Sequence, residues 1–392
     1  MIKITSEKIY SNDLPPLNNG IIIINSNGVI IDIIDPLKID YQIEDVVKLK
    51  GIITPAFVNC HSHLELAYLK SRIKPFCGIN DFILQLSKLK KDKYESNELI
   101  EQADKEMFDN GISLCADICN TDDTFNAKNN SKITYYNLFE VFGINKNIAK
   151  DKFEKAINLY NRINDNNKSI VLHSPYSVSD RLINLIVEFH RTKNLVFSIH
   201  NQESESENIF FKTGEGEMYE RMIKMGLDLS EFKSKDKTSF QYMLPLLKNI
   251  NHKIFVHNTF TNQKDLEKMG TSDKLKAFFC LCPNSNLYIE NKLPNIKMFI
   301  KNKLNIVLGT DSYASNSSLS ILDEIKTIKS NFDFISDEHL IRFATINGAK
   351  ALNMDKIFGE LKKGLQPGII NLYNVNSEPF EINADTIVKR LF

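Results

Sequence analysis

The sequence predicts an α/β fold: a (β/α)8 TIM barrel with a small β-sandwich-like module formed by the N- and C-terminal segments. Three observations support this fold class. Short apolar runs alternate with amphipathic stretches through the middle of the chain, which is typical of repeated βα units. The intervals between the runs match the length of such a unit, and both ends of the chain have a strand-and-turn texture instead.

The two ends of the chain are predicted to come together. Near the N-terminus, Gly20–Ile24 and Gly28–Ile34 are apolar runs separated by turn residues, which indicates short antiparallel strands. The C-terminal tail has the same texture. We therefore expect residues 1–54 and 359–392 to form one composite β module, and residues 55–358 to form the barrel.

Eight apolar runs are the candidate barrel strands. They are Ile53–Cys60, Ser113–Ile118, Tyr135–Val141, Ile170–His173, Leu195–His200, Ile254–His257, Ala277–Cys282 and Ile306–Gly309. His63 and His200 are 137 residues apart across four units, or about 34 residues per unit, which is normal for a barrel. The single unit from His200 to His257 takes 57 residues. This insertion is either a lid or substrate-shaping segment or a solvated surface excursion, and the sequence leaves both open.

Composition argues against several classes of partner. Lys+Arg and Asp+Glu both number 49, so no long-range field attracts nucleic acid or an anionic membrane. The apolar runs are far shorter than the roughly 18 residues of a membrane helix. The first residues lack the pattern of a signal peptide, so we expect a cytoplasmic protein with a small-molecule substrate. The six cysteines show no paired CxxC pattern and are predicted to be small core residues.

Polar side chains gather where the predicted strands end. His61 and His63 are two residues apart at the end of an apolar run, and side chains that far apart on a strand point the same way. His200, His257 and Asp311 each follow an apolar run as well. Barrel enzymes place their active sites at the carboxyl ends of the strands. These side chains are therefore candidates for one common site.

Imidazole and carboxylate groups in this number suit a metal site. They are ligands for zinc or ferrous iron, and three imidazoles with one carboxylate leave a position for a catalytic water. A metal ion lowers the pKa of such a water toward neutrality. The sequence thus predicts a hydrolase with one divalent metal ion, for which zinc is favoured and iron is the alternative.

Two glutamates are candidates for roles beside the metal. Glu203 follows His200 by three residues and is predicted to act as the general acid/base that protonates a ring nitrogen. The other interpretation is a carboxylate at a helix start, which Glu205 and Glu207 fit better. Glu65 shares the strand face of the two first histidines if the alternation continues, so we expect it to contact the substrate. A pairing of Glu65 with Lys70 or Arg72 is the alternative.

The order of these motifs resembles the amidohydrolase superfamily, in its mononuclear aminohydrolase branch of adenosine-type, guanine, cytosine, S-adenosylhomocysteine and aminodeoxyfutalosine deaminases. The matching segments span nearly the whole chain and are Pro55–Glu65, Gly111–Ser113, His173–Ser179, His200–Glu203, Cys282–Asn286 and Gly309–Ser312. The resemblance implies that the metal ligands are His61, His63, His200 and Asp311. It also implies that His257 orients the hydroxide, that Asp311 accepts the water's proton, and that Glu203 passes a proton to the ring and helps to expel ammonia.

The resemblance also bears on metal number and on substrate contacts. Binuclear members bridge two metals with a carboxylated lysine or a carboxylate of the fourth strand, but this chain has His173-Ser-Pro-Tyr there and no lysine. One metal is therefore expected. His173 resembles a substrate contact, and a histidine that supports the site through a hydrogen bond is the alternative. Glu65 resembles a substrate contact as well. The tail at Gly364–Ile370 departs from the Ala-Asp pair usual in the family, which affects only the β module.

The leading interpretation is hydrolytic deamination of an amino-substituted heterocycle, such as a purine, pterin, pyrimidine or nucleoside derivative, with release of ammonia. One alternative is an imidazolonepropionase-like hydrolase of the same superfamily, which opens a ring. Another is an inactive barrel kept as a binding or assembly scaffold, although such proteins typically lose ligands and this chain has the full set. The particular heterocycle stays open, and the resemblance is compatible with a homodimer.

Overall fold

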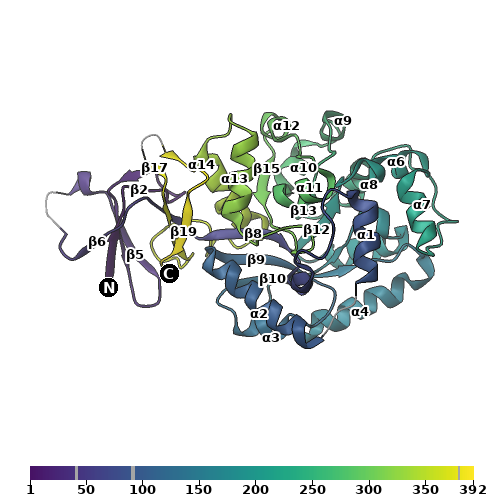
Figure 1. The fold of residues 1–392 in the computed structure, drawn as a ribbon, viewed down its shortest axis with the longest axis horizontal. Coiled ribbons are helices and arrows are strands. Elements are labelled where there is room, and N and C mark those ends of the chain that lie inside the picture. The colour runs from purple at the N-terminus through teal and green to yellow at the C-terminus, as the bar shows by residue number, and fades with distance from the viewer. Residues whose placement is uncertain (40–42, 90–92, 378–379) are drawn as a thin grey trace.

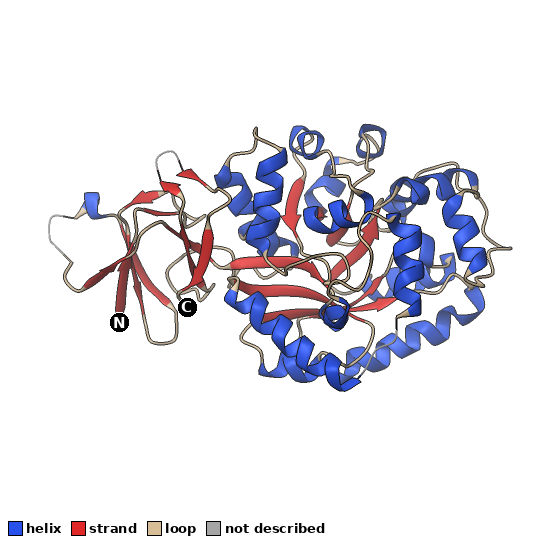
Figure 2. Ribbon diagram, viewed as in Figure 1, coloured by secondary structure: helices blue, strands red, loops and turns tan. Residues whose placement is uncertain are grey.

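The protein is described by a computed structural model over residues 1–39, 43–89, 93–377 and 380–392. Two parts lie side by side along the long axis (Figure 1). One is built almost entirely of strands and contains both termini, and the other combines strands with surrounding helices (Figure 2). Among the described helices, none has the length and apolar character needed to cross a membrane.

The strand-rich part combines both ends of the chain, as predicted. One sheet has the order β5-β4-β1-β6, from Ile30–Ile34, Ile21–Ile24, Ile2–Thr5 and Val46–Lys48. The other has the order β19-β16-β7-β2-β3, from Ile387–Arg390, Ile369–Tyr373, Ile52–Pro55, Lys8–Ile9 and Leu17–Asn18. Between β16 and β19 in the chain, β17 (Asn376–Ser377) and β18 (Phe380–Glu381) pair as a separate two-stranded sheet.

One apolar cluster joins these two sheets. It contains Ile4, Ile9, Ile22, Ile24, Ile30, Ile53, Leu361 and Ile369. All of these residues except Leu361 lie in strands of the two sheets. Burying them together stabilises the isoleucine-rich strands of the N-terminal segment. The C-terminal strand β16 pairs antiparallel with β7, so the two ends of the chain share backbone hydrogen bonds as well as this core.

The larger part contains eight parallel strands. They are β8 (Phe57–Ser62), β9 (Ile112–Cys119), β10 (Thr134–Val141), β11 (Lys168–Leu172), β12 (Val196–Asn201), β13 (His252–His257), β14 (Ala277–Leu281) and β15 (Asn305–Leu308). They form two four-stranded sheets, in the orders β8-β9-β10-β11 and β12-β13-β14-β15. The sheets approach each other at both edges, through the backbone hydrogen bond from His200 to His173 and a parallel bridge between Ser62 and Asp311.

All eight predicted runs are strands, but the first prediction was wrong about its extent. The run Ile53–Cys60 is divided into β7, which joins the strand-rich part, and β8, the first parallel strand. The chain changes sheet at Ala56, whose N–H donates to Gly368 O at 3.1 Å, whereas the N–H of Phe57 donates to Gly111 O at 2.8 Å. The sequence of this apolar run does not show where the chain passes from one sheet to the other, because the residues of β7 and of β8 are all buried.

Burial on both faces explains why the parallel strands read as continuous apolar runs. Alternate residues face opposite sides of a strand. Phe57 packs in the outer cluster with the helices, whereas Val58 and Cys60 belong to an inner cluster with residues of the other strands, such as Leu114 and Val256. Polar side chains interrupt the pattern mainly at the carboxyl ends of the strands, and that end carries the site.

The helices follow the strands in sequence. They are α1 (Gly78–Lys88), α2 (Lys93–Asp109), α3 (Phe125–Asn130), α4 (Ala149–Arg162), α5 (Asp180–His190), α6 (Glu205–Thr213), α7 (Glu217–Lys224), α8 (Ser239–Leu246), α9 (Gln263–Leu266), α10 (Thr271–Lys276), α11 (Pro283–Glu290), α12 (Ile296–Lys301), α13 (Ile321–Asn331), α14 (Asp337–Ala344) and α15 (Ile346–Ala351). Short 3-10 turns include η2 (Leu64–Leu69) and η4 (Pro175–Ser177). The long insertion between β12 and β13 thus contains three helices, α6, α7 and α8.

Candidate metal centre and active site

Three imidazoles from distant parts of the chain meet at the carboxyl ends of the strands. His61 lies in β8, His63 directly follows it, and His200 lies in β12. The Nε2 atom of His63 is 3.1 Å from His61 Nε2 and 3.3 Å from His200 Nε2. Two nitrogens that each lie about 2.0–2.1 Å from one tetrahedral zinc ion are about 3.3 Å apart. The three nitrogens therefore have the spacing of ligands that share one ion.

Asp311 adds a carboxylate to these imidazoles. Its Oδ1 lies 3.6 Å from Nε2 of both His61 and His63. Its Oδ2 accepts hydrogen bonds of 2.6 Å from the hydroxyls of Ser285 and Ser315, which orient the other oxygen toward the imidazoles. Burial would raise the pKa of Asp311, but the contact with His61 and the nearby imidazoles outweigh it, so the pKa lies well below its usual range. The carboxylate is charged and aimed at the histidines.

Two of these histidines, His63 and His200, are held toward the neutral form that a metal ligand requires. The Nδ1 atom of His200 lies 2.7 Å from the carbonyl oxygen of His173. A carbonyl can only accept, so Nδ1 carries the hydrogen and the lone pair is on Nε2, which faces the other ligands. Burial, followed by the nearby His173, lowers the pKa of His200 well below its usual value, and burial, followed by His61, lowers that of His63.

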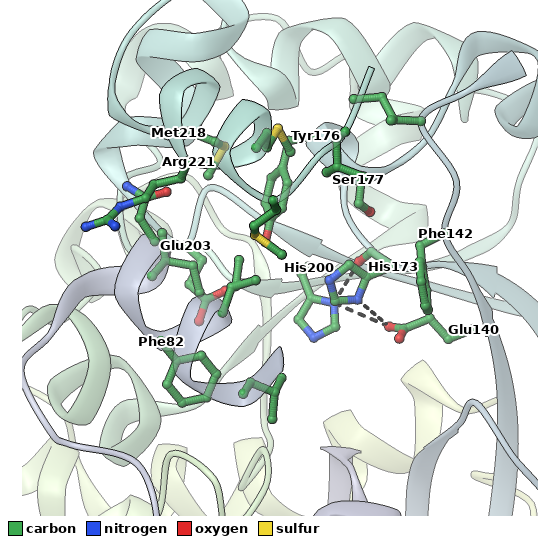
Figure 3. A pocket seen from close by; sticks show the side chains of 18 of the residues that line it. Phe82, Glu140, Phe142, His173, Tyr176, Ser177, His200, Glu203, Met218 and Arg221 are labelled. Atoms are coloured by element: carbon green, nitrogen blue, oxygen red, sulfur yellow. Dashed lines mark hydrogen bonds and ion pairs between the residues drawn. The ribbon is translucent and has the colours of Figure 1, made fainter. Parts of the chain in front are cut away.

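A second cluster of possible ligands lies beside the first and shares His200. It combines that residue with Glu140 and His173. Because Nδ1 of His200 already donates to a carbonyl, it has no lone pair for a further ion on that side. Glu140 Oε1 lies 2.9 Å from His173 Nδ1 instead (Figure 3). This cluster therefore has the chemistry of an ion pair rather than of a second metal site.

The backbone around the ligands is held in place by close contacts. A Cβ on Gly309 would lie 2.8 Å from His61 Cβ and 2.9 Å from Cys280 Sγ, so a side chain there would push the end of β15 away from β8. The buried Asn59 side chain donates to Thr310 Oγ1 at 2.8 Å and accepts from Thr310 N at 3.1 Å. These contacts tie the strand of His61 to the turn that carries Asp311.

Two further titratable groups face the same site. His257 Nε2 lies 3.6 Å from Glu203 Oε1, and the His257 ring stacks on that of His200 with centroids 5.4 Å apart. Burial, and then the charge of Asp311, raises the pKa of Glu203 well above its usual value. Burial lowers the pKa of His257 to about 3. The raised pKa favours the protonated form of the glutamate, and the imidazole is neutral at neutral pH.

The backbone conformation is unusual at His257 and Asp311, which lie at the end of β13 and shortly after β15. His257 has a left-handed φ of 71°, and Asp311 has one of 57°. Such values are costly for residues with a side chain and are found where function requires them. Glu203 precedes α6, whose N-cap is Ser204 and whose first turn contains Glu205 and Glu207. The carboxylates at the helix start are thus different residues from the one that faces the histidines.

Glu65 reaches the pocket by a different route from the one predicted. The strand ends at Ser62, so the alternation argument was wrong, and Glu65 lies in the 3-10 turn η2. Its oxygens accept from Asn120 N at 3.0 Å, Asn120 Nδ2 at 2.8 Å and Thr121 N at 3.2 Å. Burial nevertheless raises the pKa of Glu65 to about 7. Lys70, one alternative partner, pairs with Glu106 at 3.6 Å.

His173 is a further polar side chain of the cavity, and it is paired with Glu140. Burial would lower its pKa, but the adjacent Glu140 carboxylate raises it above the usual value. Glu140 itself has its pKa lowered, because the imidazoles of His173 and His200 outweigh the effect of burial. Both shifts favour the charged forms of the pair, and the His173 ring lines the pocket beside Glu140 (Figure 3).

One cavity of about 740 Å³ is lined by most of these groups, which are His63, Glu65, Glu140, His173, His200, Glu203, His257 and Asp311. Its outer walls are apolar. They are formed by Ile79, Phe82, Ile83 and Leu86 of α1, by Met218, Met222 and Met225 in and after α7, and by Phe142, Ile144 and Ile148 beyond β10. The insertion after β12 is thus a wall of the cavity, which decides between the two interpretations that the sequence left open. Arg221 of α7 pairs with Asp81 of α1 at 2.5 Å across this wall.

The sequence interpretation missed Glu140, Asn120 and the apolar wall. Glu140 has a signal that was available, because it is a single carboxylate near the end of the apolar run Tyr135–Val141, as the histidines are in theirs. Asn120 directly follows β9 in the same way. The wall has no such signal, since apolar residues on α1 and α7 look like any half-buried helix face.

Comparisons with known proteins show the family of the chain. The model of the amidohydrolase family matches residues 52–392. Adenosine deaminase of Helicobacter pylori is 25% identical over 320 residues, 80% of this chain and 76% of that protein. The 5-methylthioadenosine/S-adenosylhomocysteine deaminase of Pyrococcus abyssi is 23% identical over 325 residues, 78% of this chain and 70% of that protein.

Solved structures share the fold. The Helicobacter pylori aminofutalosine deaminase in complex with methylthio-coformycin has a TM-score of 0.78 at 21% identity, over 94% of this chain and 91% of that one. An adenosine deaminase from Xanthomonas campestris with bound zinc has a TM-score of 0.73 at 16% identity, over 95% of this chain and 84% of that one. At such identities the likeness shows a common α/β fold.

Proposed function

Because the chain belongs to the amidohydrolase family, we propose that it is a metal-dependent deaminase that removes the amino group of a purine nucleoside-like substrate and releases ammonia. One observation carries this proposal. Three imidazole nitrogens with ligand spacing and a charged carboxylate lie beside a glutamate whose pKa is raised and a neutral histidine. Several similar proteins have adenosine or an adenosine derivative in their names.

The metal would be held by His61, His63, His200 and Asp311, as predicted. Imidazole and carboxylate ligands in tetrahedral spacing favour zinc, with iron as the alternative. One ion per chain is expected, because the neighbouring cluster is engaged as an ion pair. When bound, such an ion supplies a hydroxide nucleophile at neutral pH by lowering the pKa of its water.

The remaining polar groups divide the proton transfers. Glu203 holds its proton inside the cavity and can deliver it to a ring nitrogen of the substrate, as a general acid. His257 is neutral and offers a lone pair or an N–H that orients the attacking water. The Oδ1 atom of Asp311, which faces the ligands, is placed to take up the water's proton. As the carbonyl forms, the hydroxyl added to the substrate can return a proton to the Glu203 carboxylate, and the proton held by Asp311 converts the departing amino group into ammonia.

The shape of the cavity supports a nucleoside with an apolar extension. Its base is polar, and the cationic ring of His173 can donate to a ring acceptor, while Glu65 can accept from hydroxyl or N–H donors. Its outer walls are hydrophobic side chains, and burying an apolar substituent between them would add affinity. A substituted adenosine therefore fits the two ends better than a free base does.

The proposed architecture is a barrel with a small accessory module. We take the eight parallel strands as one closed (β/α)8 barrel of residues 55–358, because backbone hydrogen bonds link the two sheets at both edges. Residues 1–54 and 359–392 would form a β-sandwich-like accessory module, supported by the cluster that both sheets share. A cytoplasmic location and a homodimer stay predictions.

The test combines metal analysis with a screen for ammonia. The purified protein should contain about one zinc per chain, and it should release ammonia from adenosine, 5′-methylthioadenosine or S-adenosylhomocysteine faster than from guanine, cytosine or a pterin. Imidazolonepropionate is included as the ring-opening substrate. Turnover of that compound without ammonia would favour the ring-opening alternative, and a protein that binds no metal would favour an inactive scaffold.

A further inference from the structure

Lys128, on the short helix α3, is a buried cation outside the active-site cavity. Its side chain is 5% exposed, and its Nζ lies 2.5 Å from Oδ2 of the fully buried Asp117. The same nitrogen donates to Asn137 Oδ1 at 3.0 Å and contacts Cys119 Sγ at 3.1 Å. Burial would lower the pKa of Lys128, but the Asp117 carboxylate raises it above the usual value. Lys128 is therefore a charged group with its donors engaged.

Substrate binding does not explain this ion pair. The helix α3 lies outside the strands β9 and β10 (Figure 1), and the residues that line the described cavity do not include Lys128 or Asp117. Removing an ammonium and a carboxylate from water is costly, and a buried pair of this kind is weak evidence for stability as such. The second carboxylate oxygen of Asp117, Oδ1, suggests a reason for the buried pair.

That oxygen reaches the metal site. Oδ1 of Asp117 accepts a hydrogen bond of 2.7 Å from the backbone N–H of Leu64, the residue directly after the ligand His63. His63 is the N-cap residue of η2, and its side chain makes no capping hydrogen bond. The first amides of a helical turn have no partner within it. Asp117 therefore supplies, from the neighbouring strand, the acceptor that His63 does not provide.

This arrangement leaves the His63 side chain free to point at the metal. An N-cap residue usually turns its side chain back to its own helix, whereas Nε2 of His63 lies 3.1 Å from that of His61. If the Leu64 amide lost its acceptor, the turn would shift and carry the ring with it. The position of the ring thus depends on a carboxylate, and the carboxylate depends on Lys128.

We propose that Lys128 and Asp117 form a positioning pair for the metal ligand His63. The ammonium holds the carboxylate in place through its contact with Oδ2, the carboxylate accepts from the Leu64 amide, and this amide fixes the turn that presents the His63 ring. The inference rests on the metal-dependent function proposed above and extends it to a helix that contacts neither metal nor substrate. It predicts that the affinity for the metal changes when Lys128 is replaced.

The direct test is the zinc affinity of Lys128→Met, measured by competition with a chromophoric chelator. We expect zinc to bind about 10–100-fold more weakly, the usual loss when a group that orients a ligand is removed. The double variant Lys128→Met/Asp117→Asn removes both charges but keeps a carbonyl oxygen for the Leu64 amide, so it should recover most of the affinity. With cobalt in place of zinc, the visible spectrum should change in Lys128→Met and return toward wild type in the double variant.

A matched control separates positioning from loss of stability. Lys253 is also a fully buried lysine, whose Nζ donates to Leu247 O at 3.0 Å and lies 3.3 Å from Asp273 Oδ1, near the start of β13 and away from the ligands. Lys253→Met should lower the melting temperature while the folded protein keeps its zinc affinity. Should Lys128→Met not fold, Lys128→Gln, which also lacks the charge, is measured with the same expectation.

The outcomes are distinct. Equal zinc affinity in wild type and the Lys128 variant overturns the positioning pair and leaves the proposed function intact. An equal loss in Lys253→Met also overturns it, since the effect would then be one of general stability. A wild-type protein that binds no zinc overturns the proposed function together with the pair.

Discussion

The substitution Glu203→Gln tests the proton transfer with little change in shape. The Glu203 side chain is buried, and burial and the charge of Asp311 raise its pKa well above the usual value. This shift favours the protonated carboxyl group, which carries a hydrogen as an amide does. Glutamine keeps that size and a donor but cannot transfer the proton. Removing a general acid costs about 10²–10⁴-fold in rate, or about 2.7–5.4 kcal/mol at about 1.36 kcal/mol per factor of ten.

The assay follows ammonia release under saturating substrate, together with metal content and KM. We expect kcat to fall by these orders of magnitude, while zinc stays bound and KM changes little, because His61, His63 and His200 are untouched. Glu290→Gln is the matched control: burial raises the pKa of Glu290 as well, and its Oε1 accepts from Ile79 N at 2.8 Å, but it is not among the lining residues of the described cavity. An unchanged kcat in Glu203→Gln would refute the assignment of the proton to this group.

Three other predictions concern the metal, pH and the cavity wall. His61→Ala should lose both zinc and activity by metal analysis and ammonia assay, and chelation should lower the melting temperature of wild type but not of this variant, because an ion at about 100 times its Kd stabilises by about 2.7 kcal/mol. Burial raises the pKa of Glu324 to about 8, so the folded state keeps a proton that the unfolded chain loses near pH 4.5. The stability of wild type relative to Glu324→Gln should therefore fall between about pH 4.5 and 8 in urea titrations, and a constant difference would contradict this. Met222→Ala, which shortens an apolar wall, should raise KM for 5′-methylthioadenosine about tenfold and leave that for adenosine nearly unchanged.

The sequence contained most of the site because the fold uses a simple rule. His61, His200, His257 and Asp311 could be found as polar residues that end apolar runs, and the carboxyl ends of parallel strands meet at one edge. Their distances could not be found this way. The separation of 3.1 Å between two Nε2 atoms depends on how the turn after β8 is held, and a strand pattern contains no information on it.

The residues that the sequence did not reveal act across elements. Lys128 and Asp117 are 11 positions apart, and a lysine in a short Asn-rich helix has the composition of an exposed turn, although the structure buries it. Glu65 was assigned to the pocket for a reason that failed, since the 3-10 turn and not the strand presents it. In both cases the position depends on a hydrogen bond from one segment to the backbone of another, which only the packed structure defines.

Burial is the largest cause of the opposite pKa shifts of Glu203 and His257. The same removal from water favours the neutral form of an acid and of a base, so it raises the pKa of Glu203 and lowers that of His257. Their facing atoms are 3.6 Å apart, and at neutral pH one is a proton donor while the other is uncharged. A pair of neighbouring groups whose pKa values are pushed apart in this way is the arrangement expected of acid–base catalysis. Asp311 is equally buried, but its imidazole neighbours reverse the effect and keep it charged. The two carboxyl groups therefore differ because their neighbours differ. Imidazoles around Asp311 lower its pKa, whereas the nearby carboxylates raise the pKa of Glu203.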